Sequence, residues 1–129
     1  MSEAPRLATD DAIFSVTTLL KYMGNDGKAL TVVTKIVHDA CAPRMAPLAQ
    51  ARAAIDAGRL GDAGKIFHGL RGSVGTLGAK RLVAAALALE QAMVDRDLSR
   101  IPTLLDAVDA EYGLVLEHAD GWLAHHAAP

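Results

Sequence analysis

The sequence has a single cysteine, few aromatic residues and no excess of basic residues. Cys41 alone cannot form an intramolecular disulfide or the cysteine-rich ligand set of a structural zinc site. Aromatic residues make up 4% of the chain, too few for a surface on which nucleic-acid bases stack. A formal net charge of −2 and a pI near 6.2 do not match the basic surface of a nucleic-acid-binding domain. We therefore expect no nucleic acid among its partners.

Long apolar runs and export signals are also missing. The most apolar stretch, residues 82–89, is far shorter than the ~20 residues that a bilayer-spanning helix needs. The start of the chain lacks the basic region and long apolar run of a signal peptide. We therefore expect a cytoplasmic protein without direct membrane contact, although the chain could be part of a larger, membrane-anchored protein.

The sequence does contain 51% hydrophobic residues, and most are spaced as on helices. Apolar residues recur at steps of three and four over residues 13–23, 30–41, 45–55, 63–77, 82–93 and 101–122. Only for residues 30–37 does the sequence also allow a β-strand. Short connections between amphipathic helices favour antiparallel neighbours. We predict an all-α fold, an antiparallel up-down four-helix bundle with one or two additional N-terminal helices, formed by residues 11–125 after an N-terminal extension over residues 1–10.

The segment around His68 differs from ordinary core sequence. On a helix, Arg71, Gly72 and Gly75 share a face with His68, beside the apolar face, so the imidazole is expected at the edge of the bundle. Each glycine inside a helix costs about 0.8–1 kcal/mol relative to alanine. Two explanations for Gly69, Gly72 and Gly75 remain open. They permit close packing between helices, or they leave a docking surface beside His68 for another molecule.

Charge is distributed unevenly along the chain. Residues 59–81 contain five basic residues and one acid, a net +4, whereas residues 90–120 contain two basic residues and eight acids, a net −6. A positive region around His68 favours an anionic partner and speeds its encounter. We expect Arg71, one helical turn from His68, to be the nearest cation for a phosphoryl group on that ring.

A set of residues at fixed spacing extends from this segment into the next predicted helix: His68, Leu70, Arg71, Gly72, Ser73, Leu77, Gly78, Ala79, Leu82, Leu89 and Glu90. The pattern closely resembles that of the histidine-containing phosphotransfer (HPt) domains of two-component phosphorelays. The resemblance extends upstream to residues 20–26 and 54–58, and it covers about residues 11–122.

The resemblance implies a role for each residue of the motif. His68 is expected to accept a phosphoryl group from the aspartyl phosphate of a receiver domain and to pass it to another receiver. Arg71 is expected to stabilise the phosphoryl group, and Glu90 to orient the imidazole directly or through water. The expected docking surface for the receiver consists of Lys65, Gly72, Ser73 and Gly75.

The resemblance further implies a monomeric phosphoryl carrier, not an enzyme with its own kinase activity. The sequence has no glycine-rich nucleotide loop and no bound cofactor is expected; the Mg²⁺ that assists transfer is expected in the receiver domain. The implied partners are receiver domains of response regulators or a hybrid sensor histidine kinase. Two alternatives remain: a helical docking module for receivers that carries no phosphate, and the dimerisation helix pair of a histidine kinase.

Overall fold

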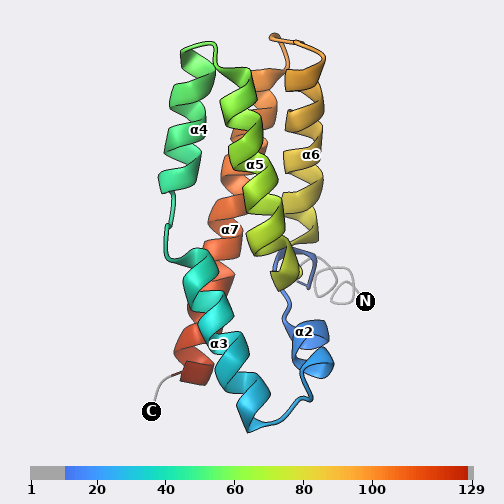
Figure 1. The fold of residues 1–129 in the computed structure, drawn as a ribbon, viewed down its shortest axis with the longest axis vertical. Helices are drawn as coiled ribbons and strands as arrows, with labels where there is room; N and C mark the ends of the chain where they lie inside the picture. Colours follow the sequence, from blue (N-terminus) through green and yellow to red (C-terminus); the bar gives the residue numbers. More distant parts are fainter. Residues whose placement is uncertain (1–10, 128–129) are drawn as a thin grey trace, which may run out of the picture.

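The computed structural model describes residues 11–127, and all regular secondary structure in this range is helical (Figure 1). The all-α prediction is therefore confirmed, and residues 30–37 belong to a helix. The expected extension over residues 1–10 lies outside the described residues. The elements are α2 (Thr17–Tyr22), α3 (Gly27–Cys41), α4 (Ala46–Asp56), α5 (Leu60–Val74), the short 3-10 helix η1 (Gly75–Leu77), α6 (Lys80–Val94) and α7 (Ile101–Ala127).

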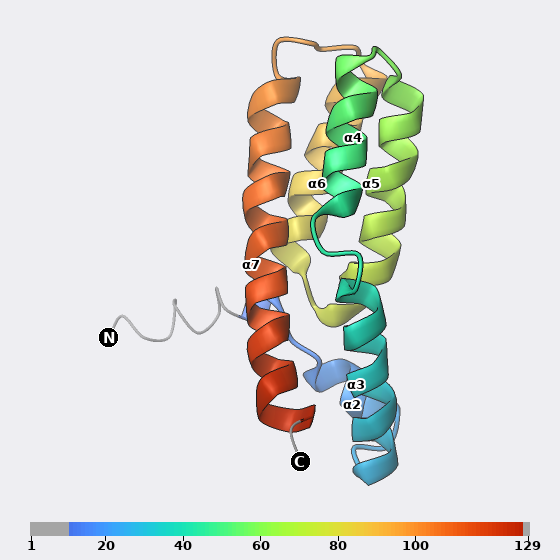
Figure 2. The ribbon, with the colours of Figure 1, turned by 90° about the vertical axis from the view of Figure 1, so that its left-hand side faces the viewer.

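Helices α4, α5, α6 and the first half of α7 form an antiparallel up-down bundle (Figures 1 and 2). Helix α7 has 27 residues, about 40 Å at 1.5 Å per residue, and continues well beyond the other three helices. Its second half is covered by α3, and α2 packs against α3. The predicted four-helix bundle is confirmed, with α2 and α3 as the additional N-terminal helices.

The apolar faces that the sequence predicts are buried most regularly in α5 and α6. Four predicted positions on each helix face the core, and their spacing of three and four keeps each set on one side. Full burial of a large apolar side chain stabilises a fold by about 1.5–3 kcal/mol, so these faces hold the two helices side by side. The buried positions are Ala63, Phe67, Leu70 and Val74 in α5, and Leu82, Ala86, Leu89 and Met93 in α6.

The prediction of one continuous helix over residues 13–23 is wrong. Residues 14–16 are not helical, and the N–H of Ser15 donates a hydrogen bond to the carbonyl of Leu77 at 2.7 Å. Ile13 and Val16 are nevertheless buried. The apolar residues thus have helical spacing and are buried, but the backbone between them is not helical. It pairs instead with η1, which is distant in the sequence.

The fully buried Tyr112 of α7 has an unpaired hydroxyl. Its oxygen has no hydrogen-bond partner among the described residues, and burial raises the pKa of Tyr112. An unsatisfied buried polar group costs about 1–3 kcal/mol. The ring of Tyr112 thus stabilises the core, whereas its hydroxyl does not.

Replacing Tyr112 with phenylalanine should leave the free energy of unfolding unchanged or raise it by up to about 1 kcal/mol, because the ring stays packed and the unpaired hydroxyl is removed. Chemical denaturation of both proteins measures the difference. Tyr112→Ala is the control. It should lower the free energy of unfolding by about 3–5 kcal/mol, because it removes the packed ring. A loss above 1 kcal/mol in Tyr112→Phe would show that the hydroxyl does stabilise the fold.

Candidate functional site

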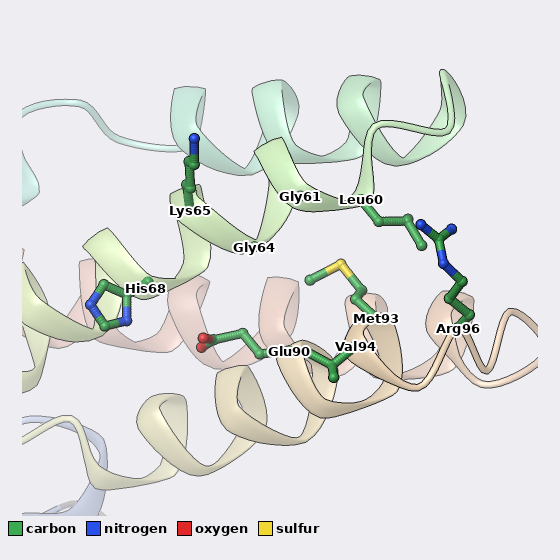
Figure 3. A pocket seen from close by; sticks show the side chains of 9 residues that line it. All are labelled: Leu60, Gly61, Gly64, Lys65, His68, Glu90, Met93, Val94 and Arg96. Carbon is green, nitrogen blue, oxygen red and sulfur yellow. The ribbon is translucent and has the colours of Figure 1, made fainter.

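His68 lies on α5, on the side that borders α6 (Figure 3). The preceding residue, Phe67, is fully buried, whereas His68 and Gly69 are exposed. A helix turns by about 100° per residue, so a core residue at position 67 brings its neighbour to the edge of the bundle. The imidazole is therefore reachable from solvent.

A groove of about 500 Å³ extends from His68 along α5 and α6 (Figure 3). It is mostly apolar, with Lys65 and Arg96 as its basic residues. Val94 is 78% exposed, so this apolar side chain is left largely uncovered by the described chain. The lining residues are Leu60, Gly61, Gly64, Lys65, His68, Glu90, Met93, Val94 and Arg96.

The glycines of α5 leave the backbone beside His68 uncovered. Gly75 follows α5 as the first residue of η1, and a Cβ atom added there would contact Cγ2 of Val83 at 3.4 Å. At the four glycines of α5 itself an added Cβ would meet no atom within 4 Å, which excludes close packing within the described chain. These are Gly61, Gly64, Gly69 and Gly72.

Gly61 and Gly64 are not among the residues predicted for the site. Both line the groove, and they precede His68 by seven and four residues. Positions four and seven residues apart fall on one face of a helix, so the same spacing rule that selected Gly72 and Gly75 also selects these two. The groove lies on the N-terminal side of His68 along α5, a direction that the motif itself did not indicate.

The guanidinium of Arg71 connects His68 to Glu90. Its Nη2 donates a hydrogen bond to Nδ1 of His68 at 2.9 Å. Its Nε and Nη2 donate to Oε2 and Oε1 of Glu90 at 2.6 Å and 3.0 Å. The Arg71 and Glu90 side chains are 23% and 18% exposed, and the hydrogen bond to Glu90 raises the pKa of Arg71. The guanidinium is thus a permanent cation held against the ring.

The structure brings the three predicted site residues together, with Arg71 in the middle. The hydrogen bonds of the Glu90 carboxylate go to Arg71, and none joins it to the His68 ring within residues 11–127. The expectation that Glu90 orients the imidazole directly or through water is not tested by this arrangement and stays a prediction.

The four predicted docking residues lie on different parts of α5 and η1. Lys65 lines the groove. Gly72 and Ser73 are exposed and Gly75 is half-buried, but all three lie outside the groove, on the C-terminal side of His68. The Ser73 hydroxyl donates to the carbonyl of Leu70 at 3.4 Å. Their contact with a receiver stays a prediction.

The positive region expected around His68 is weaker than the charge count along the sequence indicates. Several of its basic side chains are paired with acids, and one of these acids lies in the distant helix α7. The pairs are Arg59 with Asp62 at 3.3 Å, Arg71 with Glu90 at 2.6 Å, and Arg81 with Glu111 at 2.7 Å. Lys65 and Arg96 of the groove have no ion pair in the described part of the chain and supply its positive charge.

None of the helices within residues 11–127 combines the length and apolar character that a membrane span requires. The same residues contain no group of three or more histidine, cysteine, aspartate or glutamate side chains arranged to hold a metal ion.

Comparison with known proteins places this site in a family. A family model described as the Hpt domain matches residues 44–118, more than half of the chain. The matched range includes α4, α5, α6 and most of α7, and with them His68, Arg71 and Glu90. Comparisons with curated proteins and with solved structures found no match. The chain therefore belongs to the Hpt domain family, the phosphocarriers of two-component phosphorelays.

Proposed function

We propose that this chain is a phosphorelay intermediate. His68 accepts a phosphoryl group from the aspartyl phosphate of one receiver domain and passes it to an aspartate of another. The observation that carries the proposal is the exposed imidazole of His68 at an open groove, with a permanent cation bound to its ring. Membership of the Hpt family supports the same assignment.

The chemistry requires a free ring nitrogen. In the transfer, an N–P bond forms at the imidazole, the O–P bond of the aspartyl phosphate breaks, and the aspartate leaves as a carboxylate. Nδ1 of His68 is bound by Arg71, whereas Nε2 has no hydrogen-bond partner among the described residues. Nε2 is therefore the nitrogen to which we assign the phosphoryl group. We assign Arg71, whose guanidinium contacts the same ring, to pair with the transferred anion.

The groove beside His68 suits the surface of a folded partner. Exposed Val94 and the apolar lining offer area that is covered only when another protein docks. Gly61 and Gly64 let the partner approach the backbone closely. Lys65 and Arg96 complement the negative charge of an aspartyl phosphate site, which favours rapid encounter. We therefore assign receiver docking to this groove.

A carrier of this kind needs no nucleotide site of its own. The Mg²⁺ that assists the transfer is assigned to the receiver domain, where it offsets the charge of the phosphoryl group. We place the exchange in the cytoplasm, with the chain acting as a monomer. Its partners are then receiver domains of response regulators or of a hybrid sensor histidine kinase.

The proposal is tested by incubating the chain with a receiver domain that carries a radioactive phosphoryl group on its aspartate. We expect label to move to the chain in an acid-labile form, the behaviour of phosphohistidine, and then to a second receiver added later. A docking module would bind the receiver and take up no label. Binding without label would therefore replace the proposed function with that alternative.

A further inference from the structure

The contact with Arg71 determines which nitrogen of His68 carries the proton. Arginine can only donate hydrogen bonds, so Nδ1, which lies 2.9 Å from Nη2, must be an acceptor without a proton. In a neutral imidazole the proton then resides on Nε2. The unphosphorylated ring thus has its lone pair on Nδ1 beneath the guanidinium, and an N–H at the nitrogen that the transfer needs.

Glu90 holds the guanidinium in this position. The carboxylate takes two hydrogen bonds from Arg71, and charge-assisted bidentate pairs of this kind are among the strongest in proteins. Nη2 donates both to Oε1 of Glu90 and to Nδ1 of His68, at 3.0 Å and 2.9 Å, so the two acceptors share one donor atom. If the guanidinium moves away, the carboxylate becomes an acceptor for an N–H at Nδ1.

We propose that Arg71, positioned by Glu90, is a latch that holds the unphosphorylated His68 ring in the Nε2–H form, and that an incoming phosphoryl group opens the latch by drawing Arg71 away from Nδ1. Glu90 is a positioning residue in this scheme, because it acts on the resting ring through Arg71. The opening step rests on the proposed function, whereas the latch is a property of the free chain.

Phosphoryl transfer to Nε2 requires the ring proton to move to Nδ1. After Arg71 leaves, water takes the proton from Nε2 and returns one to Nδ1, whose N–H then donates to Glu90. The Nε2 lone pair attacks phosphorus and forms the N–P bond. The O–P bond of the aspartyl phosphate breaks, and its electron pair stays on the departing carboxylate. Arg71 pairs with the phosphoryl oxygens.

The latch is tested by ¹⁵N NMR of the His68 ring in the free chain at alkaline pH, since the shift of each ring nitrogen shows whether it is protonated. We expect the proton on Nε2 in the wild-type chain. In Arg71→Ala it should move to Nδ1, because Glu90 becomes its acceptor, and the double variant Arg71→Ala/Glu90→Ala should lose this change. Lys65→Ala is the control, because Lys65 is a cation one turn from His68 that makes no hydrogen bond to the ring. This variant should keep the wild-type spectrum.

A wild-type ring protonated at Nδ1 would overturn the latch, and so would an Arg71→Ala ring that remains protonated at Nε2. Thermal unfolding of each variant shows whether it is folded. The protonation of the wild-type ring is measured on the wild-type chain and does not depend on the variants. No receiver is needed, so failure of the latch leaves the proposed function standing. A chain that takes up no phosphoryl group would overturn the proposed function, while the tautomer would still be measured.

The opening step has its own readout. Phosphoramidate can supply a phosphoryl group directly, since its P–N bond breaks and ammonia leaves as the N–P bond to the ring forms. We expect the Nε–H resonance of Arg71 to shift when the ring is loaded, because its pairing with Glu90 changes. An unmoved Arg71 resonance in the loaded chain would show that the guanidinium does not leave.

Discussion

Replacing Gly78 with alanine should lower the free energy of unfolding by about 2–5 kcal/mol. Gly78 follows η1 with a φ of +72°, in the left-handed region, where a residue with a Cβ costs about 1–2 kcal/mol. The added Cβ would also lie 2.4 Å from the carbonyl oxygen and 2.9 Å from the amide nitrogen of Ser15. Neither atom belongs to a flexible side chain, so backbone must move, at a further cost of about 1–3 kcal/mol.

The matched control is Gly58→Ala, at the turn between α4 and α5. Gly58 has a similar φ of +79°, but an added Cβ would meet nothing within 4 Å. Gly58→Ala should therefore lower the free energy of unfolding only by the cost of the left-handed backbone conformation, about 1–2 kcal/mol. Denaturant titrations of both variants give the comparison. Equal losses at the two glycines would contradict the close approach of Ser15 to Gly78.

Replacing Gly64 with glutamine should make the fold more stable and the phosphoryl transfer at least tenfold slower. Glutamine is a better helix former than glycine, by about 0.5–1 kcal/mol, and an added Cβ at Gly64 touches nothing in the described chain. The new side chain would, however, enter the groove next to His68 and keep the receiver from docking closely. A tenfold loss corresponds to about 1.4 kcal/mol of transition-state free energy.

Gly121→Gln in α7 is the control for this variant. Its added Cβ also meets no atom within 4 Å, but the position is not part of the groove. It should therefore show the gain in stability and keep the wild-type transfer rate. Transfer reactions with one phosphorylated receiver, quenched at successive times, measure the transfer rate of both variants. A Gly64→Gln chain that is loaded at the wild-type rate would show that the receiver does not use this groove.

Local sequence pattern was sufficient for the four helices of the bundle. In α5 and α6 the steps of three and four place every predicted apolar residue in the core. The pattern was less informative where a distant segment decides the outcome. Arg52 of α4 lies within the range 45–55 of helical apolar spacing, four residues after buried Leu48, yet its side chain is exposed and pairs with Asp109 of α7 at 3.3 Å. Ser15 leaves the helix because Leu77 offers it a hydrogen bond.

The three residues that the structure brings together could be named from the sequence, but the contacts between them could not. The motif places Arg71 one turn from His68, and helical geometry brings them together. Glu90 belongs to the next helix, so its partner depends on how α5 and α6 pack. For the same reason a charge count along the chain overstated the positive field. The Arg71–Glu90 pair cancels charge next to the imidazole, and only the folded chain reveals it.

His68 is the residue to which we assign the phosphoryl group. The most direct measurement is mass spectrometry of the chain after incubation with a phosphorylated receiver, with digestion and fragmentation under alkaline conditions that preserve phosphohistidine. We expect the modification on His68, together with complete loss of loading in a folded His68→Gln variant that still binds the receiver. A phosphoryl group found on His38, His118 or any other residue, or undiminished loading of His68→Gln, would contradict it.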